Sequence, residues 1–462
     1  MISVVVPVIL LFVILLVKKI PKIGGSVTAA LAIAGFSALL LCGIFNPIDW
    51  LKAWLDGFDR LSWVIWIAIF GMIYSETQTS LGAVDTILDT SRAAFGKSAK
   101  GLYVAAFVAM IFFGALLGEG LSVAASVGVL IIPALMDLGL ETEEVSATIV
   151  LGALLGSLCP PLTNGIVLSA SLAGANYDTV LKYSFITVPL LSAIVVGIYT
   201  FRLVKIKELP ENLRMAESTG EILKKRWKTL VPTLLLVLIM ILRYNPWASQ
   251  VNLDFVAFIF KPFTKLIANI PFIKGLSNLI VLTIVFCTVV AFFYKSVRKR
   301  GLVDIAKTGF KNYIPCGKVH VACALMLGAF YAGGLIEKIA DWATTLNVHV
   351  LKLGGSLAMG LMGMITGSQS TVQNTIFAFF APALQATGMS PEATALAGSH
   401  IAMGAQAFPP TDLCTIVVIG LVAAATGKEC NYVKSMMISL LGFLILFLGG
   451  VSLLYILPAI GI

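Results

Sequence analysis

Two windows of this sequence place oxygen-bearing side chains inside stretches that are otherwise apolar. In the first window, Glu119 precedes a serine-rich segment, and Thr163, Asn164 and Gly165 follow a Pro-Pro pair that begins at Pro160. Carboxylate, hydroxyl and amide oxygens are the ligands that hard cations prefer, whereas the unpaired N–H groups at the start of a helix attract anions. The window therefore predicts a site where an anion and a cation bind side by side.

The second window repeats this arrangement with more polar residues. Ser368 opens a Ser-Gln-Ser-Thr segment, Asn374 follows it, and a second Pro-Pro pair at Pro409 leads into Thr411 and Asp412. Neither window contains a lysine or an arginine. An anion bound here would therefore depend on helix dipoles, amides and a co-bound cation.

The composition shows which solvent surrounds these windows. Of the 462 residues, 59% are apolar and 12% are charged, whereas soluble domains carry about 25% charged residues. Such a chain would expose an aggregating surface in water, so its solvent is lipid. The net charge of +9 comes from bases at the ends of apolar segments, which argues against nucleic-acid binding. The seven cysteines lack CxxC spacing, which argues against disulfides or a zinc site.

Apolar runs near the bilayer length of about 20 residues give the expected membrane spans. They fall at 1–17, 25–45, 61–78, 183–201, 229–243, 277–294, 319–336 and 435–458. Two mixed segments, 48–60 and 337–352, are expected to be helices lying on the membrane surface, and 245–275 is expected to be external and interfacial.

Basic residues set the expected orientation. The stretches 202–228 and 295–318 are rich in lysine and arginine and should be cytoplasmic. Lys18 to Lys22 should then also lie inside, which places the N-terminus outside. The first 17 residues have no preceding positive charge, so they are expected to be a retained helix rather than a signal peptide.

The two polar windows are copies of one another. Pro133 and Pro382 are 249 residues apart, and the same spacing relates glycines, glutamates and both Pro-Pro pairs. Each copy reads as an apolar arm, a polar tip, a returning arm and a helix broken by Pro-Pro. Because the charge rule puts the copies on opposite sides of the membrane, we expect an all-α integral membrane fold with an inverted repeat, two re-entrant hairpins and two broken helices.

Broken backbone at membrane depth is tolerated where it lines a cavity, and in transporters with inverted repeats the substrate site lies where the repeats meet. The alternative is that the glycines only allow close helix packing and the prolines only kink helices. Any single hydroxyl could equally bond to its own helix.

The residues expected to bind the substrate are Ser122, Thr163, Asn164, Gly165, Ser368, Thr371, Asn374 and Thr411. The residues expected to bind the coupling ion, Na⁺ or H⁺, are Glu119, Ser126, Pro160, Thr375, Pro409 and Asp412.

Three ionisable residues in these windows stand out at expected membrane depth, where charge is costly and marks a functional candidate by default. Asp412 directly follows the second Pro-Pro pair, so it is expected to coordinate a cation or carry a proton. Glu119 stands at a tip that could face water. His400 lies in a helix of small residues and fits a structural histidine equally well.

With these residues in view, the chain resembles the large membrane subunit of tripartite ATP-independent periplasmic (TRAP) transporters, within the ion transporter superfamily. The resemblance covers roughly 101–460 and rests on SVAASVGVLIIPAL and LLGSLCPPL in the first copy and on FAPAL and GAQAFPPTD in the second. The chain departs from the family pattern where Leu162 replaces a serine of the break and where Glu119 adds a carboxylate.

The resemblance implies an elevator transporter of the inner membrane that carries a small organic anion, a carboxylate or dicarboxylate, with sodium and without a prosthetic cofactor. It implies scaffold helices at 1–100, a first transport-domain half at 101–182, further scaffold helices at 183–355, a second half at 356–432 and a C-terminal helix at 433–462. The implied partners are a periplasmic binding protein, a small membrane subunit and a second copy in a homodimer.

Other functions remain open from the residues alone. A proton-linked permease for a hydroxy acid or sugar acid would use Glu119 or Asp412 as its titrating group. A cation/proton antiporter would use the same acids without an organic substrate. An intramembrane enzyme is not expected, because the sequence has no Ser/His, paired-Asp or HExxH arrangement at helical spacing.

Overall fold

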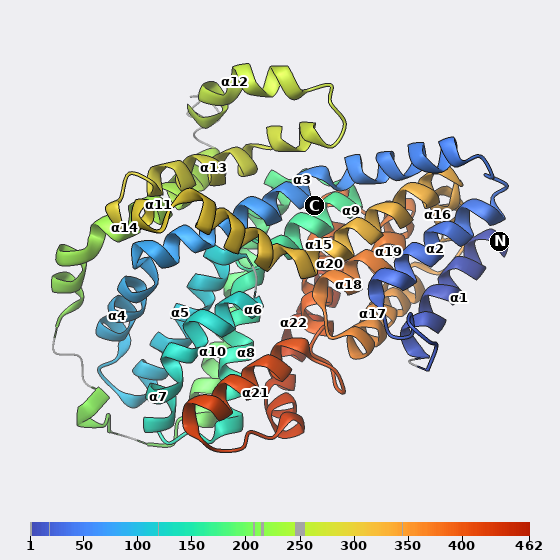
Figure 1. Ribbon diagram of the computed structural model, residues 1–462. Helices are drawn as coiled ribbons and strands as arrows, with labels where there is room; N and C mark the ends of the chain where they lie inside the picture. The colour runs from blue at the N-terminus through green and yellow to red at the C-terminus, as the bar shows by residue number, and fades with distance from the viewer. Residues whose placement is uncertain are drawn as a thin grey trace.

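The architecture comes from a computed structural model, which describes residues 2–17, 19–118, 120–206, 208–213, 217–244, 255–343 and 345–462. Within these residues the chain is helical and has no strand. Figure 1 shows most helices gathered in one bundle, with one helical arm set apart from it. The predicted all-α fold is confirmed.

The first half of the chain contributes ten α-helices and one π-helical turn to the described structure. They are α1 (Ile2–Leu16), α2 (Val27–Leu41), α3 (Pro47–Leu81), α4 (Ala83–Phe95), α5 (Ala99–Leu117), α6 (Gly120–Val123), η1 (Ala124–Gly128), α7 (Val129–Asp137), α8 (Thr142–Leu158), α9 (Asn164–Ala173) and α10 (Tyr177–Leu203).

The second half repeats this series after a connecting region. The connecting elements are η2 (Glu211–Leu213), α11 (Thr219–Tyr244), α12 (Phe255–Ile267) and η4 (Ile273–Ser277). The second series is α13 (Leu279–Ala291), α14 (Lys295–Arg300), α15 (Leu302–Ala332), α16 (Leu335–Ala343), α17 (Val348–Thr366), α18 (Gln369–Val372), η5 (Gln373–Phe377), α19 (Ala378–Ala386), α20 (Pro391–Ala405), α21 (Leu413–Thr426) and α22 (Tyr432–Ala459).

The helix bounds reproduce the sequence spacing. Every end of α5, α6, η1 and α7 lies 249 residues before the matching end of α17, α18, η5 and α19. The arms α5 and α17 both end at a left-handed glycine, Gly118 with φ 68° and Gly367 with φ 61°. Each arm contacts the π-helical turn that follows its glycine, so each copy folds back as a helical hairpin.

Several helices are suited to a membrane by length and composition. Five described helices, α3, α5, α10, α17 and α22, are long and apolar enough to cross a bilayer. A sixth is formed if the two parts of α15, Leu302–Ile314 and Gly317–Ala332, which meet at 55°, count as one span.

The two expected surface helices are not separate elements. Residues 48–60 form the first part of α3, a 35-residue helix that Asn46 caps and Pro47 begins. No proline or glycine with positive φ interrupts this helix before Gly82, and its charged residues pair at helical spacing, as in Arg60 with Asp56. Residues 337–352 divide between α16 and α17, because the chain leaves the helix after Ala343.

The expected interfacial segment falls partly outside the described residues, at 245–254. The remainder includes α12, the arm that Figure 1 shows apart from the bundle. Phe258 and Leu266 on this helix are 78% and 77% exposed. Its placement at the external membrane surface stays a prediction.

The helices α3 and α15, both in segments predicted to form the scaffold, cross at close range. A Cβ atom on Gly57 would lie 1.8 Å from the carbonyl oxygen of Ala324, and one on Gly328 would lie 1.9 Å from that of Ala53. Only glycine allows the two backbones to approach this closely. The helices around this crossing follow the symmetry of the repeat, since α2 packs on α15 and the corresponding helix α13 packs on α3.

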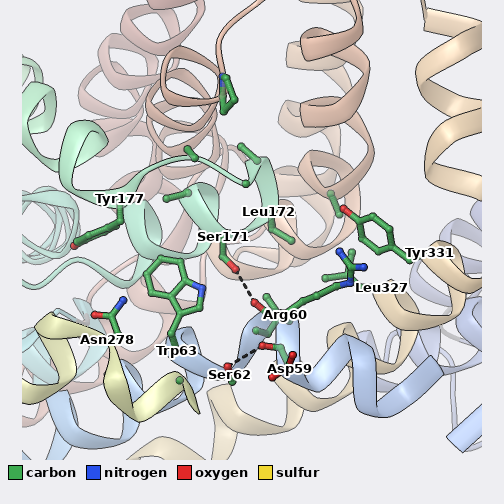
Figure 2. Close-up of a pocket in the computed structure, with 18 of the residues that line it drawn as sticks. Asp59, Arg60, Ser62, Trp63, Ser171, Leu172, Tyr177, Asn278, Leu327 and Tyr331 are labelled. Atoms are coloured by element: carbon green, nitrogen blue, oxygen red, sulfur yellow. Dashed lines mark hydrogen bonds between the residues drawn. The ribbon is translucent and has the colours of Figure 1, made fainter. Parts of the chain in front are cut away.

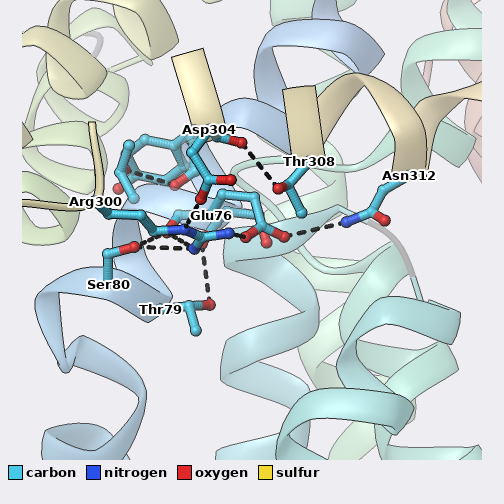
Figure 3. Close-up of polar contacts among 10 residues, drawn as sticks. Glu76, Thr79, Ser80, Arg300, Asp304, Thr308 and Asn312 are labelled. Atoms are coloured by element: carbon cyan, nitrogen blue, oxygen red, sulfur yellow. Dashed lines mark hydrogen bonds and ion pairs between the residues drawn. The ribbon is translucent and has the colours of Figure 1, made fainter. Parts of the chain in front are cut away.

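A polar cluster ties the far end of α3 to α14 and α15 (Figure 3). The guanidinium of Arg300 contacts Glu76 at 2.7 Å, Asp304 at 2.8 Å and the Ser80 hydroxyl at 3.0 Å. Asn312 donates to the second oxygen of Glu76 at 3.1 Å. These contacts hold the basic segment before α15 against the scaffold.

Candidate functional site

Both proline pairs lie in gaps between helices, as predicted. The first gap separates the end of α8 at Leu158 from the start of α9 at Asn164, and the second separates the end of α20 at Ala405 from the start of α21 at Leu413. Both Pro-Pro peptide bonds are cis. Each gap leaves a new helix N-terminus, with its free N–H groups, inside the molecule.

Equivalent residues cap these two N-termini. Thr163 accepts from the amide of Ile166 at 3.3 Å. Asp412, 249 residues later, accepts from the amides of Cys414 at 3.0 Å and Thr415 at 3.2 Å and from the Thr415 hydroxyl. Both capping residues are buried. The carboxylate of Asp412 therefore already holds its own helix, and its predicted role as an ion ligand stays a prediction.

Each hairpin tip rests on the break of its own repeat. A Cβ atom on Gly118 would lie 2.9 Å from the carbonyl oxygen of Leu162, and one on Gly367 would lie 3.0 Å from the Thr411 side chain. The glycines thus serve both the left-handed turn and the close approach. This contact brings tip and break together, as the repeat predicts.

The second hairpin is also fastened to the break of the first repeat. The Gln373 amide donates to the carbonyl oxygen of Gly165 at 2.6 Å and to the Ser169 hydroxyl at 2.7 Å. Gln369 packs against Gly165 so closely that a Cβ there would lie 2.1 Å from its amide nitrogen. These bonds join the two repeats at the start of α9.

Asn374 lies in the π-helical turn of this hairpin and is fully buried. Neither the amide nitrogen nor the amide oxygen of its side chain has a hydrogen-bond partner in the described structure, and the side-chain oxygen of Gln373 has none either. Buried polar atoms in native proteins are almost always hydrogen-bonded. These three atoms are therefore the strongest candidates in this site to contact a solute or an ion.

The other predicted residues of the second hairpin make mainly local bonds. Ser368 caps α18 through the amide of Thr371 at 3.4 Å, and its hydroxyl lies 3.2 Å from that of Ser370. The Thr375 hydroxyl donates to the carbonyl oxygen of Thr371 at 2.6 Å. For Thr375 the structure thus shows the back-bonding that a helical threonine commonly makes.

The first hairpin is described less completely. Glu119 lies outside the described residues, and so do the side chains of Ser122 and Ser126. The backbone of α6 and η1 contacts α21, which mirrors the contact of α18 and η5 with α9. Asn164, at the start of α9, is half-buried.

Sequence reasoning missed a pair of bonds that crosses between the repeats. The carboxylate of Glu143 on α8 accepts from the amide of Asn431 at 3.2 Å, and that of Glu392 on α20 accepts from the amide of Asn176 at 3.1 Å. Asn431 caps α22 and Asn176 caps α10, so each asparagine begins the helix that comes after the broken helix of the other repeat. The available signal was that the two glutamates are 249 residues apart, the same spacing that relates the other repeated residues.

His400 is fully buried on α20. Its Nδ1 atom lies 2.8 Å from the carbonyl oxygen of Leu396, while its Nε2 atom has no partner in the described structure. A Cβ atom on Gly450 of α22 would lie 2.9 Å from the His400 Cβ. The side chain is therefore packed between α20 and α22, which is compatible with the structural reading.

The two repeats differ in what covers them. Val167 on α9 is 1% exposed, whereas Ile416, its equivalent on α21, is 49% exposed. Pro160 is buried and Pro409 is half-buried. Figure 1 shows α21 at one edge of the bundle. The environment of the second break is therefore more open than that of the first.

Two hairpins and two broken helices that meet inside an apolar helical bundle define a multi-pass membrane transporter. Residues 8–354 match the family described as "Tripartite ATP-independent periplasmic transporter, DctM component". The chain belongs to this DctM family, the large permease of TRAP transporters. Its members are transporters, so the protein is not an enzyme. The match begins earlier than the resemblance at 101–460 and ends within α17, the first arm of the second hairpin.

A solved structure shares the fold. The crystal structure of the YdaH transporter of Alcanivorax borkumensis, described as having an unusual topology, superposes with a TM-score of 0.59 and 19% sequence identity. The alignment covers 89% of this chain and 88% of that one. No curated protein matches the chain.

Proposed function

We propose that the protein carries a small carboxylate or dicarboxylate together with sodium, and that the hairpins and breaks form the shared binding site. The observation that carries the proposal is the buried Asn374 amide, which lacks partners for both of its polar atoms. An amide can donate to a carboxylate oxygen and accept a cation at the same time. The windows contain no lysine or arginine, so a cation is the available counter-charge for the anion.

The unequal cover of the two repeats supports an elevator mechanism. The scaffold helix α3 contacts α9, and residues at matched positions are covered in one repeat and open in the other. If residues 101–182 and 356–432 move together against the remaining helices, the second repeat would take the covered position in turn. Two-sided access to one fixed site is what inverted repeats provide.

Orientation and partners complete the proposal. The basic connections support an N-terminus outside, and the proposal puts the protein in the cytoplasmic membrane. DctM components belong to tripartite systems, so a periplasmic binding protein and a small membrane subunit are the proposed partners, with a homodimer as the proposed assembly.

The test uses purified protein in proteoliposomes. A thermal-shift screen of carboxylates with and without sodium first identifies a ligand, because a ligand that binds the folded state raises its apparent stability. Uptake of that ligand is then measured under a sodium gradient or a pH gradient. We expect uptake only with sodium, and we expect Asn374→Ala and Asp412→Asn to abolish it. Ser452→Ala, an exposed hydroxyl on α22 that bonds to its own helix, should leave uptake unchanged.

Three results would overturn the assignment. Uptake driven by a pH gradient without sodium would select the proton-linked permease. Sodium/proton exchange without any organic substrate would select the antiporter. Unchanged uptake in Asn374→Ala would remove the hairpin site itself.

A further inference from the structure

A cavity of about 890 Å³ lies between the helices of the proposed scaffold and those of the hairpin domain (Figure 2). The scaffold contributes α3, η4 and α15, and the hairpin domain contributes α19 and the turn between α9 and α10. The helix α9 starts at the first break and lines the cavity from Ala170 on, about 9 Å along the helix. The cavity wall does not include the tip glycines, Gln373 or Asn374, and its volume is in the usual range for small-molecule sites.

Three helices place this cavity on the face opposite the basic connections. The helices α10 and α13 begin beside the cavity, at Tyr177 and Asn278, and lead to the basic stretches 202–228 and 295–318. The helix α15 begins in the second of these stretches and ends at the cavity, near Tyr331. By the charge rule this is the outer face of the membrane.

One end of the cavity presents an arginine side chain. The guanidinium of Arg60 lies 3.7 Å from the ring centroid of Tyr331, and its Nε atom contacts Asp56 at 2.7 Å. The stack fixes the plane of the guanidinium. In the described part of the chain, no hydrogen bond is formed by its two terminal amino groups. They offer a fixed pair of donors, which matches the geometry of a carboxylate.

Neither nearby acid bonds to the two terminal amino groups, since Asp56 contacts only the Nε atom and Asp59 is engaged elsewhere. Asp59 pairs with Lys274, and its other oxygen accepts from the amide of Phe272 at 3.0 Å. The Ser171 hydroxyl of the hairpin domain donates to the backbone carbonyl of Arg60 at 3.2 Å. Asp59 is thus occupied in holding η4 on α3, and the Arg60 side chain is left facing the cavity.

The other end of the cavity is aromatic. The rings of Trp63 and Tyr177 meet edge to face, with centroids 5.7 Å apart, and Figure 2 shows them on the opposite side of the cavity from Arg60 and Tyr331. Tyr177 is 7% exposed. An aromatic surface suits an apolar body.

We propose that this cavity is a second ligand site, distinct from the transport site, which binds an aromatic monocarboxylate. The carboxylate contacts the Arg60 guanidinium, and the ring packs against Trp63 and Tyr177. Such a ligand touches the scaffold and the hairpin domain at once. If the two parts move as proposed above, an occupied cavity holds them together and slows transport.

The test measures equilibrium binding and needs no transport substrate. Benzoate and its neutral analogue benzamide are titrated against the protein in lipid nanodiscs by saturation-transfer NMR, with empty nanodiscs subtracted. We expect saturable binding of benzoate and none of benzamide. Arg60→Gln should raise the benzoate Kd by at least about tenfold, because it removes a charge-assisted hydrogen bond. Lys261→Gln, which removes an exposed charge from α12, should leave the Kd unchanged.

A variant of the transport site separates this inference from the proposed function. Asn374→Ala should keep benzoate binding, since Asn374 is not part of the cavity wall. If Arg60→Gln does not yield folded protein, Trp63→Leu at the aromatic end replaces it and should also raise the Kd. Absence of benzoate binding, equal binding of benzamide, an unchanged Kd in Arg60→Gln or loss of binding in Asn374→Ala would each overturn the cavity assignment. A failed uptake assay would leave it untouched.

Discussion

Polar residues of the hairpin site differ in how fully their atoms are engaged. Both oxygens of Asp412 accept hydrogen bonds from the first turn of α21, whereas the Asn374 amide is bonded to nothing in the described structure. A saturated carboxylate positions its helix, while an unsatisfied buried amide costs about 1–3 kcal/mol until a ligand arrives. At the residue scale, Asn374 is therefore the side chain that we most expect to contact the proposed solute.

Lys352 is a buried amine whose role can be traced to one proline. It lies on α17 and donates to the carbonyl oxygen of Leu454 on α22 at 2.6 Å. In a continuous helix that carbonyl would accept from the amide four residues later, but Pro458 stands there and has no N–H. The lysine supplies the missing donor across the helix interface.

Lys352→Met should therefore destabilise the protein by about 1–3 kcal/mol, because it leaves the Leu454 carbonyl unsatisfied. In a Pro458→Ala background the alanine amide can satisfy that carbonyl, so the same substitution should cost clearly less. Thermal denaturation in detergent measures both effects, with the exposed Lys265→Met as the control. Equal losses of stability in the two backgrounds would show that Lys352 acts through some other contact.

The two hairpins share their helix bounds but not their fastenings. Gln373 joins hairpin two to α9, whereas Ala124 occupies the equivalent position in hairpin one. Gln369, which packs on Gly165, is likewise matched by Gly120. At the scale of elements, the second hairpin is thus tied to the opposite repeat by side chains that the first hairpin lacks at those positions.

The crossing of α3 and α15 makes a direct prediction. Gly57→Ala would place a methyl group 1.8 Å from the Ala324 carbonyl oxygen, so we expect the helices to separate and the folded yield to collapse. Gly71→Ala, on the same helix but with no atom within 4 Å of its new Cβ, should be neutral or stabilise by about 0.5–1 kcal/mol. Size-exclusion profiles and melting temperatures report both outcomes. A well-folded Gly57→Ala protein would contradict the close packing.

Much of this element layout could be predicted because glycine and proline act locally. The 249-residue spacing located both hairpins and both breaks, since left-handed turns and helix ends depend on the residue at the turn itself. The prediction of a separate helix at 48–60 was wrong, because the charged residues there resemble those of a surface helix until their pairing within α3 is known. The partners of Gln373 and Lys352 depend on segments far apart in the chain, which no local pattern reveals.

The asymmetry between the repeats could not be predicted, because two copies of one pattern carry no information about which copy is covered. Val167 is 1% exposed and Ile416 is 49% exposed. In the proposed elevator this asymmetry belongs to one state of the inverted repeat, and a second state would exchange the exposures. At the scale of the molecule, transport would then be a relative movement of two rigid parts.

A cross-link between those parts tests this movement. Ser171 on α9 touches the Arg60 backbone on α3 at 3.2 Å, so a short bifunctional thiol reagent should join cysteines placed at both positions. If the hairpin domain must slide on α3, joining Ser171→Cys to Arg60→Cys should stop sodium-driven uptake in proteoliposomes, and cleavage of the linker should restore it.

The matched control joins two helices within the proposed scaffold. The hydroxyls of Thr86 on α4 and Thr229 on α11 lie 2.9 Å apart, so Thr86→Cys with Thr229→Cys can be linked by the same reagent without bridging the moving boundary. Uptake should survive that link. The variant with cysteines at positions 60 and 171 should also transport when no reagent is added. Full activity after complete cross-linking of α3 to α9 would mean that these helices never part, and the substrate would then have to cross by local opening of the hairpins alone.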